Sequence, residues 1–257
     1  MANKVTLKET IVVRVGGAEV MDPMDLRRLS ARVRCYLKNN KRAVIVHGGD
    51  LEVRDLHRAL HVPYGKRRGL RATSEASMAI VTMVLCGLVN TRLVAQFNAD
   101  GIPSIGLSGI DLSLMQSDFL NAEDLGRTGG PPRVSHRWLE HLLAQGVTPI
   151  LAPVCLASDG QPINVDPDTV ANAVAAALCA SALELVCRVP ELMPPDGVAD
   201  RIEASEIPRL IREGFARGDM VRKLQAASAA LAGSVNTVRI GDLHDLSRDE
   251  ATVVRRT

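Results

Sequence analysis

The chain has 257 residues, of which 46% are hydrophobic, so it is long enough to bury one large core or two closely joined lobes. Its 31 basic and 29 acidic residues leave a formal net charge of only +2, which gives no global argument for nucleic acid as a partner. Aromatic residues make up 2% of the chain, so the core must consist mainly of Val, Leu, Ile and Ala.

Signal-peptide and membrane-span patterns are not evident in the sequence. The first ten residues, MANKVTLKET, are polar. The longest apolar run, 170–186, is interrupted by Asn172, Ser181 and Glu184. We therefore expect a cytoplasmic protein with no membrane as partner.

A strand that ends in two glycines occurs twice near the start of the chain. Residues 11–15 (IVVRV) precede Gly16 and Gly17, and residues 43–47 (AVIVH) precede Gly48 and Gly49. Apolar β-branched runs are typical of strands buried on both faces of a parallel sheet, and glycine lets backbone N–H groups approach an anion closely. Because open α/β sheets bind ligands at the carboxyl ends of their strands, the two turns predict a phosphoryl site.

The rest of the chain alternates between helical and strand patterns, which is typical of the α/β class. Apolar residues at helical spacing predict helices over 23–39, 51–60, 75–99, 135–145, 170–180, 207–215 and 220–231. Short apolar runs predict strands within 104–109, 148–154 and 183–189, and a last strand over 237–240. Glycine and proline in 118–134 predict a hairpin or a lid-like loop.

The segment 62–71, VPYGKRRGLR, carries the strongest local positive charge, with four basic residues among turn-forming prolines and glycines. Such a loop is either a solvated surface segment or a clamp for a carboxylate or phosphate, for which arginine is the favoured residue. The residues alone leave both interpretations open.

Two histidines are the only pair that we weigh as metal ligands. His57 and His61 are four residues apart, so they could share one helical face, but no acidic third ligand is spaced as in the HExxH motif. We expect surface histidines here and predict no metal ligand set in the protein.

Eight segments, taken in order, resemble the amino acid kinase family, with a spacing similar to that of acetylglutamate kinases. They are VVRVGGAEV, VIVHGG, GLRAT, MVLCGLVNTRLV, IGLSGIDLSL, PILAP, DGQPINVDPDTVANAVAAAL and GDMVRKLQAA. The strings GGAE, MVLCGLVN and IGLSGIDL look closest to the branch that phosphorylates glutamate or aminoadipate attached to an amino-group carrier protein. The resemblance covers nearly the whole chain.

The resemblance implies a fold. It is a three-layer αβα sandwich with a mainly parallel open sheet, in which residues 1–160 hold an acyl amino acid and residues 161–257 hold the nucleotide. Members of the family are commonly dimers or larger assemblies, so a homodimer is implied as well.

The resemblance also implies a reaction, in which the γ-phosphoryl group of ATP, with Mg²⁺, passes to a side-chain carboxylate and gives an acyl phosphate. The residues that it assigns to phosphoryl transfer are Arg14, Asp168 and Lys223, with Gly16, Gly17, Gly48 and Gly49 binding the phosphoryl group. Those that it assigns to the acyl amino acid are Arg71 and Asn164. Backbone amides and flanking cations would offset charge on the moving phosphoryl group.

Four residues depart from the family pattern. Arg14 replaces a lysine, and arginine's planar fork is not an equivalent point charge. Asp50 replaces a glycine or other small residue directly after the second glycine pair, and we hypothesise that it pairs with Arg14 and plugs the phosphoryl site or resets its size. Arg188 and Glu191 replace an acidic or amide residue and a glycine in the nucleotide-binding loop.

Three functions remain open at this point. The first is an active kinase for an N-acylated glutamate or aminoadipate, acetylated or linked to an acidic carrier protein that would suit the basic segment 62–71. The second is a degenerate kinase that binds an amino acid or a protein partner, as the four departures together favour. The third is a kinase of the same fold for a phosphonate, phosphate or carbamate, against which Arg71 and Asn164 argue.

Overall fold

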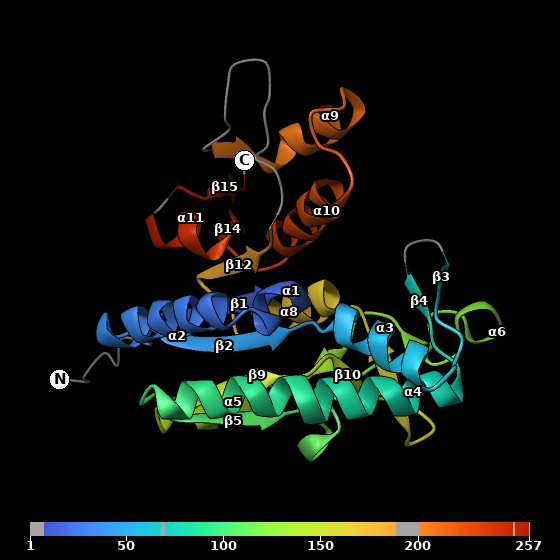
Figure 1. Ribbon diagram of the computed structural model, residues 1–257. Helices are drawn as coiled ribbons and strands as arrows, with labels where there is room; N and C mark the ends of the chain where they lie inside the picture. The colour runs from blue at the N-terminus through green and yellow to red at the C-terminus, as the bar shows by residue number, and fades with distance from the viewer. Residues whose placement is uncertain (1–7, 68–69, 189–200, 249, 257) are drawn as a thin grey trace.

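The computed structural model describes residues 8–67, 70–188, 201–248 and 250–256 (Figure 1). A large central sheet runs through this part of the chain. Its strands are β1 (Thr10–Val15), β2 (Arg42–His47), β5 (Ser104–Leu107), β9 (Thr148–Leu151), β12 (Ala182–Val186), β13 (Arg201–Glu203), β14 (Thr237–Gly241) and β15 (Thr252–Arg255).

Within the described residues the sheet has eight strands in the order β13-β15-β14-β12-β1-β2-β9-β5. Neighbouring strands run parallel except for β14 and β15, which are antiparallel. The strand β1 is central, with β2 on one side and β12 on the other, so the chain leaves its carboxyl end where the topology of the sheet changes direction. Ligand crevices form at such points in open α/β sheets.

Helices cover both faces of this sheet and make the fold a three-layer αβα sandwich. On one face lie α2 (Pro23–Lys38), α4 (Glu75–Thr82), α5 (Asn90–Ala99) and α11 (Leu243–Arg248). On the other lie α7 (His136–Ala144), α8 (Pro167–Ala177) and α10 (Asp219–Ala232). Alternation along β1 accounts for the two cores, since Val13 packs in one cluster with Leu29 and Phe97 while Val12 packs in the other with Val174. The predicted fold class is confirmed.

Smaller elements surround the carboxyl end of the central sheet. A second sheet has the order β7-β11-β10-β6-β8, formed by β7 (Thr128–Gly129), β11 (Pro162–Val165), β10 (Val154–Leu156), β6 (Met115–Gln116) and β8 (Arg133–Val134). A separate hairpin pairs β3 (Gly65–Arg67) with β4 (Leu70–Ala72). The short helices are α1 (Gly17–Met21), α3 (Asp50–Ala59), α6 (Ala122–Leu125), α9 (Ile207–Arg212), η2 (Asp111–Ser113) and η3 (Ala204–Glu206).

The longest helix is continuous from Glu75 to Ala99, because a π-helical segment, η1 (Met83–Val89), joins α4 to α5. It is long and apolar enough to cross a membrane by length and composition alone, and 44% of its most apolar window is buried inside the structure. A core helix of a globular protein meets the same test. This one packs along the sheet through fully buried Leu93 and Phe97, so we interpret it as a core helix (Figure 1).

Three expectations from the sequence need correction. The segment 118–134 is not only a loop, since it contributes α6, β7 and β8 to the region around the second sheet. The strand predicted at 237–240 is present as β14, but it is not the last one, because β15 follows and pairs antiparallel with it. The sequence does not predict β13 and β15, because each is only three or four residues long and begins and ends in polar or charged residues, which hides the apolar period.

Candidate active site

Both glycine pairs lie at the carboxyl ends of β1 and β2 and lead into helices. Gly16 precedes α1, and Gly49 precedes α3. The backbone N–H of Gly48 donates to the carbonyl oxygen of Val15 over 2.9 Å, which joins the two turns. A Cβ on Gly17 would lie 3.0 Å from the Cα of Gly49, so only glycine allows this approach. Unpaired backbone N–H groups at the start of a helix favour an anion.

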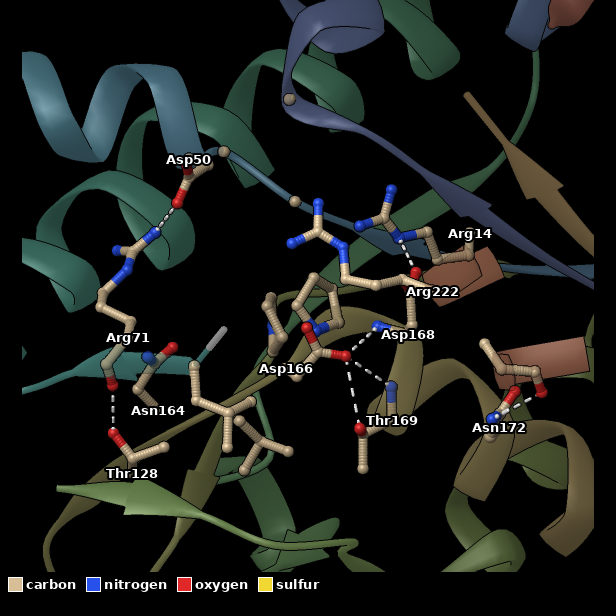
Figure 2. A pocket seen from close by; sticks show the side chains of 18 of the residues that line it. Arg14, Asp50, Arg71, Thr128, Asn164, Asp166, Asp168, Thr169, Asn172 and Arg222 are labelled. Carbon is tan, nitrogen blue, oxygen red and sulfur yellow. Dashed lines mark hydrogen bonds and ion pairs between the residues drawn. The ribbon is translucent and has the colours of Figure 1, made fainter. Parts of the chain in front are cut away.

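A cleft of about 550 Å³ opens beside these turns. Its lining joins both halves of the chain and is rich in charge, with five basic side chains, Arg14, Lys66, Arg71, Arg222 and Lys223, and three acidic ones, Asp50, Asp166 and Asp168. The surplus of positive charge suits an anionic ligand. In Figure 2 the Asp50–Arg71 pair lies at one end of the cleft and the Arg14–Asp168 pair at the other.

Asp168 joins the two cations that the sequence assigned to phosphoryl transfer. Its Oδ1 lies 2.5 Å from Nε of Arg14, and Nζ of Lys223 donates to Oδ1 and Oδ2 over 2.9 and 2.8 Å. The Lys223 side chain is only 3% exposed and that of Asp168 14% exposed. Burial raises the pKa of Asp168, but the charges of Arg14 and Lys223 outweigh it and hold that pKa below its usual value. The carboxylate therefore stays charged and fixes both cations.

Local structure explains why these three groups meet. Arg14 follows Val13 on β1 and so points to the opposite face of the sheet, toward α8 and α10. Asp168 lies in the first turn of α8, which Asp166 caps by accepting the N–H groups of Asp168 and Thr169. Because Asp166 caps the helix, the Asp168 carboxylate is left to face the cleft.

Arg71 and Asn164, the residues assigned to the acyl amino acid, both line the cleft. Asn164 is 8% exposed on β11, and its Nδ2 donates to Oγ1 of Thr73. The carbonyl oxygen of Arg71, on β4, accepts from Oγ1 of Thr128 over 2.6 Å, while its guanidinium lies 5.3 Å from the ring centre of Tyr64. The hairpin and the second sheet thus hold the two side chains in one region.

Asp50 pairs with Arg71, so the hypothesis of an Arg14–Asp50 pair is wrong. Nη2 of Arg71 and the hydroxyl of Tyr64 both donate to Oδ1 of Asp50, and Lys66 lies 3.4 Å from Oδ2. The reason is direction, because Asp50 begins α3 and faces the hairpin, whereas Arg14 faces α8. Burial raises the pKa of Asp50, but Arg71, Tyr64 and Lys66 together lower it by more than burial raises it. The net pKa is below its usual value, so Asp50 is ionised at neutral pH.

Arg188 is not one of the residues that line the cleft. It forms ion pairs with Asp22 and Asp25 at the start of α2, and its backbone N–H donates to Oε1 of Glu19. It therefore ties the end of β12 to α1 and α2. Glu191, the other departure in this loop, lies outside the described residues.

A buried histidine supports the second glycine turn from behind. His47 has no exposed surface; its Nδ1 lies 3.1 Å from the carbonyl oxygen of Gly48, and its Nε2 lies 3.1 Å from Nδ2 of Asn90. This geometry requires a neutral ring that donates through Nδ1 and accepts at Nε2. Burial lowers the pKa of His47 to about 4, in keeping with that form.

One of the two histidines departs from the expectation of surface residues, whereas His61 is exposed as expected. His57 is buried, with Nε2 2.7 Å from Oγ of Ser77, because α3 packs against α4. Another group, Asp242, His244 and Asp245, has ligand atoms within 4.8 Å of one another. There Asp242 already accepts the N–H groups of His244 and Asp245, so capping of α11 explains the cluster.

Sequence reasoning missed Arg222 and Asp166 as members of the cleft, and Tyr64 as a hydrogen-bond partner of Asp50. Arg222 lies next to Lys223 on α10, where arginines are typical of a solvated face. Figure 2 shows its guanidinium projecting into the cleft between the two ion pairs. The signal that could have found it is its position beside the assigned lysine.

Paired glycine turns on an open parallel sheet, with a carboxylate that holds two cations beside them, define a class of protein: an enzyme that transfers a phosphoryl group. Comparison with known proteins agrees with this class. The model of the family described as "Amino acid kinase family" matches residues 9–242. The chain belongs to the amino acid kinase family.

Named relatives narrow the class. The chain is 36% identical over 232 residues to the acetylglutamate kinase of Geobacillus stearothermophilus, covering 90% of this chain and 89% of that one. It is 38% identical over 252 residues to that of Roseiflexus sp. strain RS-1, covering 96% and 94%. The crystal structure of smu.665 from Streptococcus mutans UA159 superposes with a TM-score of 0.80 at 25% identity, covering 96% and 98%. The chain is thus an ATP-dependent phosphotransferase with a carboxyl group as acceptor.

Proposed function

We propose that the protein transfers the γ-phosphoryl group of ATP to the side-chain carboxylate of an N-acylated glutamate or aminoadipate. One observation carries the proposal: Asp168 holds Arg14 and Lys223 together, beside the two glycine turns. The cations offset charge on the equatorial oxygens of the moving phosphoryl group, and the backbone amides of Gly16, Gly17, Gly48 and Gly49 hold it. No general base is needed, because the acceptor carboxylate is already ionised at neutral pH.

The acceptor binds toward Arg71, in the half formed by residues 1–160, and toward Asn164, which lies on β11 just beyond that half. The nucleotide binds in the half formed by residues 161–257. The relatives that are named acetylglutamate kinases support an N-acylated glutamate as the acceptor, and with it a place in amino-acid biosynthesis of the arginine or lysine type. A carrier-linked acceptor has less support, because the described basic side chains of the 62–71 segment are already paired. Lys66 and Arg71 contact Asp50, and Arg67 contacts Asp124.

The cleft suits a nucleoside triphosphate because basic side chains outnumber acidic ones in its lining and because the glycine turns present backbone N–H groups. Mg²⁺ binds oxygen ligands and usually contacts one or two carboxylates together with substrate phosphates. Among the described cleft carboxylates, Asp166 alone has an oxygen, Oδ2, outside any hydrogen bond or ion pair. We propose that Asp166 and the phosphate oxygens hold Mg²⁺, which would further neutralise charge on the phosphates.

We also propose a cytoplasmic homodimer. Met83 and Leu88 on the long helix are each 52% exposed. Leu112, in the short helix η2 that follows β5, is 60% exposed. A second copy of the chain would cover such side chains. Light scattering measures the mass, and Leu88→Glu should shift it toward that of one chain.

An alternative function rests on the Asp50–Arg71 pair. A carboxylate that occupies the substrate-binding arginine, together with Arg14 in place of lysine, favours a degenerate kinase that binds an amino acid or a protein partner in a regulatory role. Mg-nucleotide then should not raise the unfolding temperature, since only ligands selective for the folded state stabilise it.

Acyl-phosphate formation, trapped with hydroxylamine, tests the proposal. The acceptors are acetylglutamate, acetylaminoadipate and a carrier-linked glutamate, each with Mg-ATP, and Arg14→Lys is assayed in parallel. Turnover by the natural protein shows that Arg14 replaces lysine, and the preferred acceptor identifies the substrate. If neither protein turns over and neither is stabilised by nucleotide, the kinase proposal is wrong and the binding role is favoured.

A further inference from the structure

The guanidinium of Arg71 is occupied on one side only. Its Nη2 donates to Asp50, whereas its Nη1 is buried and has no hydrogen-bond partner among the described residues. The side chain is 11% exposed and lies against the cleft. A buried donor without a partner is costly, so Nη1 is available to a ligand in the cleft.

Two further side chains, besides Arg71, hold the carboxylate of Asp50 in place. The Tyr64 hydroxyl donates to Oδ1 over 2.8 Å, and the Lys66 ammonium lies 3.4 Å from Oδ2. Since its pKa is lowered, Asp50 is a fixed negative charge at neutral pH. Figure 2 shows it pointing at Arg71 from the start of α3.

A free carboxylate is a poor match for this pair. An arginine recognises a carboxylate best with two parallel N–H groups, and here one of its terminal nitrogens already donates to Asp50. A second carboxylate beside Nη1 would also approach the charge of Asp50, and like charges brought together cost several kcal/mol.

A carboxamide matches the same pair. Its carbonyl oxygen accepts one hydrogen bond from Nη1 of Arg71, and its N–H donates to the carboxylate of Asp50. One donor and one acceptor side by side are what a primary amide or a peptide bond presents, and neither carries a charge.

We propose that Asp50 is a specificity-determining residue, which selects acceptors whose α-carboxyl group is an amide or a peptide bond rather than a free carboxylate. This rests on the proposed function, in which Arg71 meets the α-carboxyl group and the side-chain carboxylate accepts the phosphoryl group.

The test compares N-acetylglutamate with its α-amide, which share the same reacting side-chain carboxylate. The natural protein should have a kcat/KM about tenfold or more higher for the amide, and Asp50→Asn should lower this preference by about tenfold, since each factor of ten corresponds to about 1.4 kcal/mol. The matched control is Asp55→Asn, an exposed aspartate on the same helix that pairs with Arg58. It should keep the preference of the natural protein.

Isothermal titration calorimetry with both compounds measures the same preference as a ratio of binding affinities, without any need for turnover. Equal or stronger binding of the free acid by the natural protein, or a preference that Asp50→Asn leaves unchanged, overturns the role of Asp50. Amide-selective binding that depends on Asp50, without acyl-phosphate formation, instead supports the selectivity and refutes the kinase. Failure to bind either compound refutes both.

Discussion

Replacing Asp168 with asparagine tests the centre of the site most directly. The substitution keeps the shape of the side chain but removes the charge that Arg14 and Lys223 share. Lys223 would then keep an ammonium that is 3% exposed and has no carboxylate beside it. Removing one partner from a buried ion pair costs about 3–5 kcal/mol.

That cost is a large part of the stability of the protein. Domains unfold with a free energy of about 5–15 kcal/mol, and for a chain of this size each kcal/mol shifts the midpoint by about 2–4 °C. We therefore expect Asp168→Asn to lower the unfolding midpoint by about 6–20 °C and to abolish acyl-phosphate formation. Circular dichroism during heating measures the first, and hydroxylamine trapping measures the second.

Two further variants interpret this result. Asp118→Asn removes an exposed carboxylate from a surface pair with Arg133. It should change the free energy of unfolding by only about 0–1 kcal/mol, so the midpoint should move little. Adding Lys223→Met to Asp168→Asn should recover part of the loss, because the buried charge is gone as well. A midpoint for Asp168→Asn that matches Asp118→Asn would refute our account of the buried pair.

The pH dependence follows from the lowered pKa of Asp168. The unfolded chain takes up a proton at this residue at a higher pH than the folded chain does, so the stabilisation is present above the unfolded pKa of 3.8. It is lost as the pH falls through the folded pKa. The natural protein and Asp168→Asn should therefore become closer in stability in acid.

Two other predictions concern the glycine turns. Gly17→Ala should stop turnover and cost about 1–3 kcal/mol, because the new Cβ would lie 3.0 Å from the Cα of Gly49, which cannot move aside. Gly87→Ala, whose Cβ would meet nothing within 4 Å, is its control. It should leave turnover unchanged and raise stability by about 0.5–1 kcal/mol, because alanine is favoured over glycine inside a helix, as the trapping assay and urea unfolding can measure. Burial lowers the pKa of His47 from 6.5 to about 4. Between these two pH values the His47 ring takes up a proton in the unfolded chain but not in the folded one, so the protein should become less stable as the pH falls from about 6.5 to about 4. His47→Gln should remove this dependence from the unfolding curves, and a slope that persists would show that other groups cause it.

The sequence predicts the fold well because the two central strands are long, apolar and marked by glycine pairs. It predicts short strands poorly, as β13 and β15 illustrate, since three or four residues carry almost no periodic signal. The position of β15 depends on pairing with β14, which is a tertiary contact.

The candidate site shows the same limit in its side chains. The resemblance brings Arg14, Asp168 and Lys223 together as residues of one site, and the structure joins them by ion pairs. It could not reveal which cation Asp50 contacts, because the direction of a side chain at a helix start depends on what packs opposite. The segment 62–71 is predicted as a solvated surface loop or as a clamp for an anion, and neither interpretation places Asp50 beside Arg71.

The π-helical segment η1 has a consequence for how the long helix can vary. A π-turn holds one more residue than an α-turn, and successive residues of an α-helix are about 100° apart around its axis. Because the wide turn already absorbs this extra residue, deleting one residue within Met83–Val89 would restore an α-turn and leave the rest of the helix in place. The same deletion in α4, which holds no extra residue, would rotate everything after it by about 100°. Asn90, Leu93 and Phe97 would leave the core together, and His47 would lose its amide partner. The extra residue in this turn therefore lets the two ends of a 25-residue helix keep different neighbours: α3 and β11 at one end, and β5 at the edge of the sheet at the other.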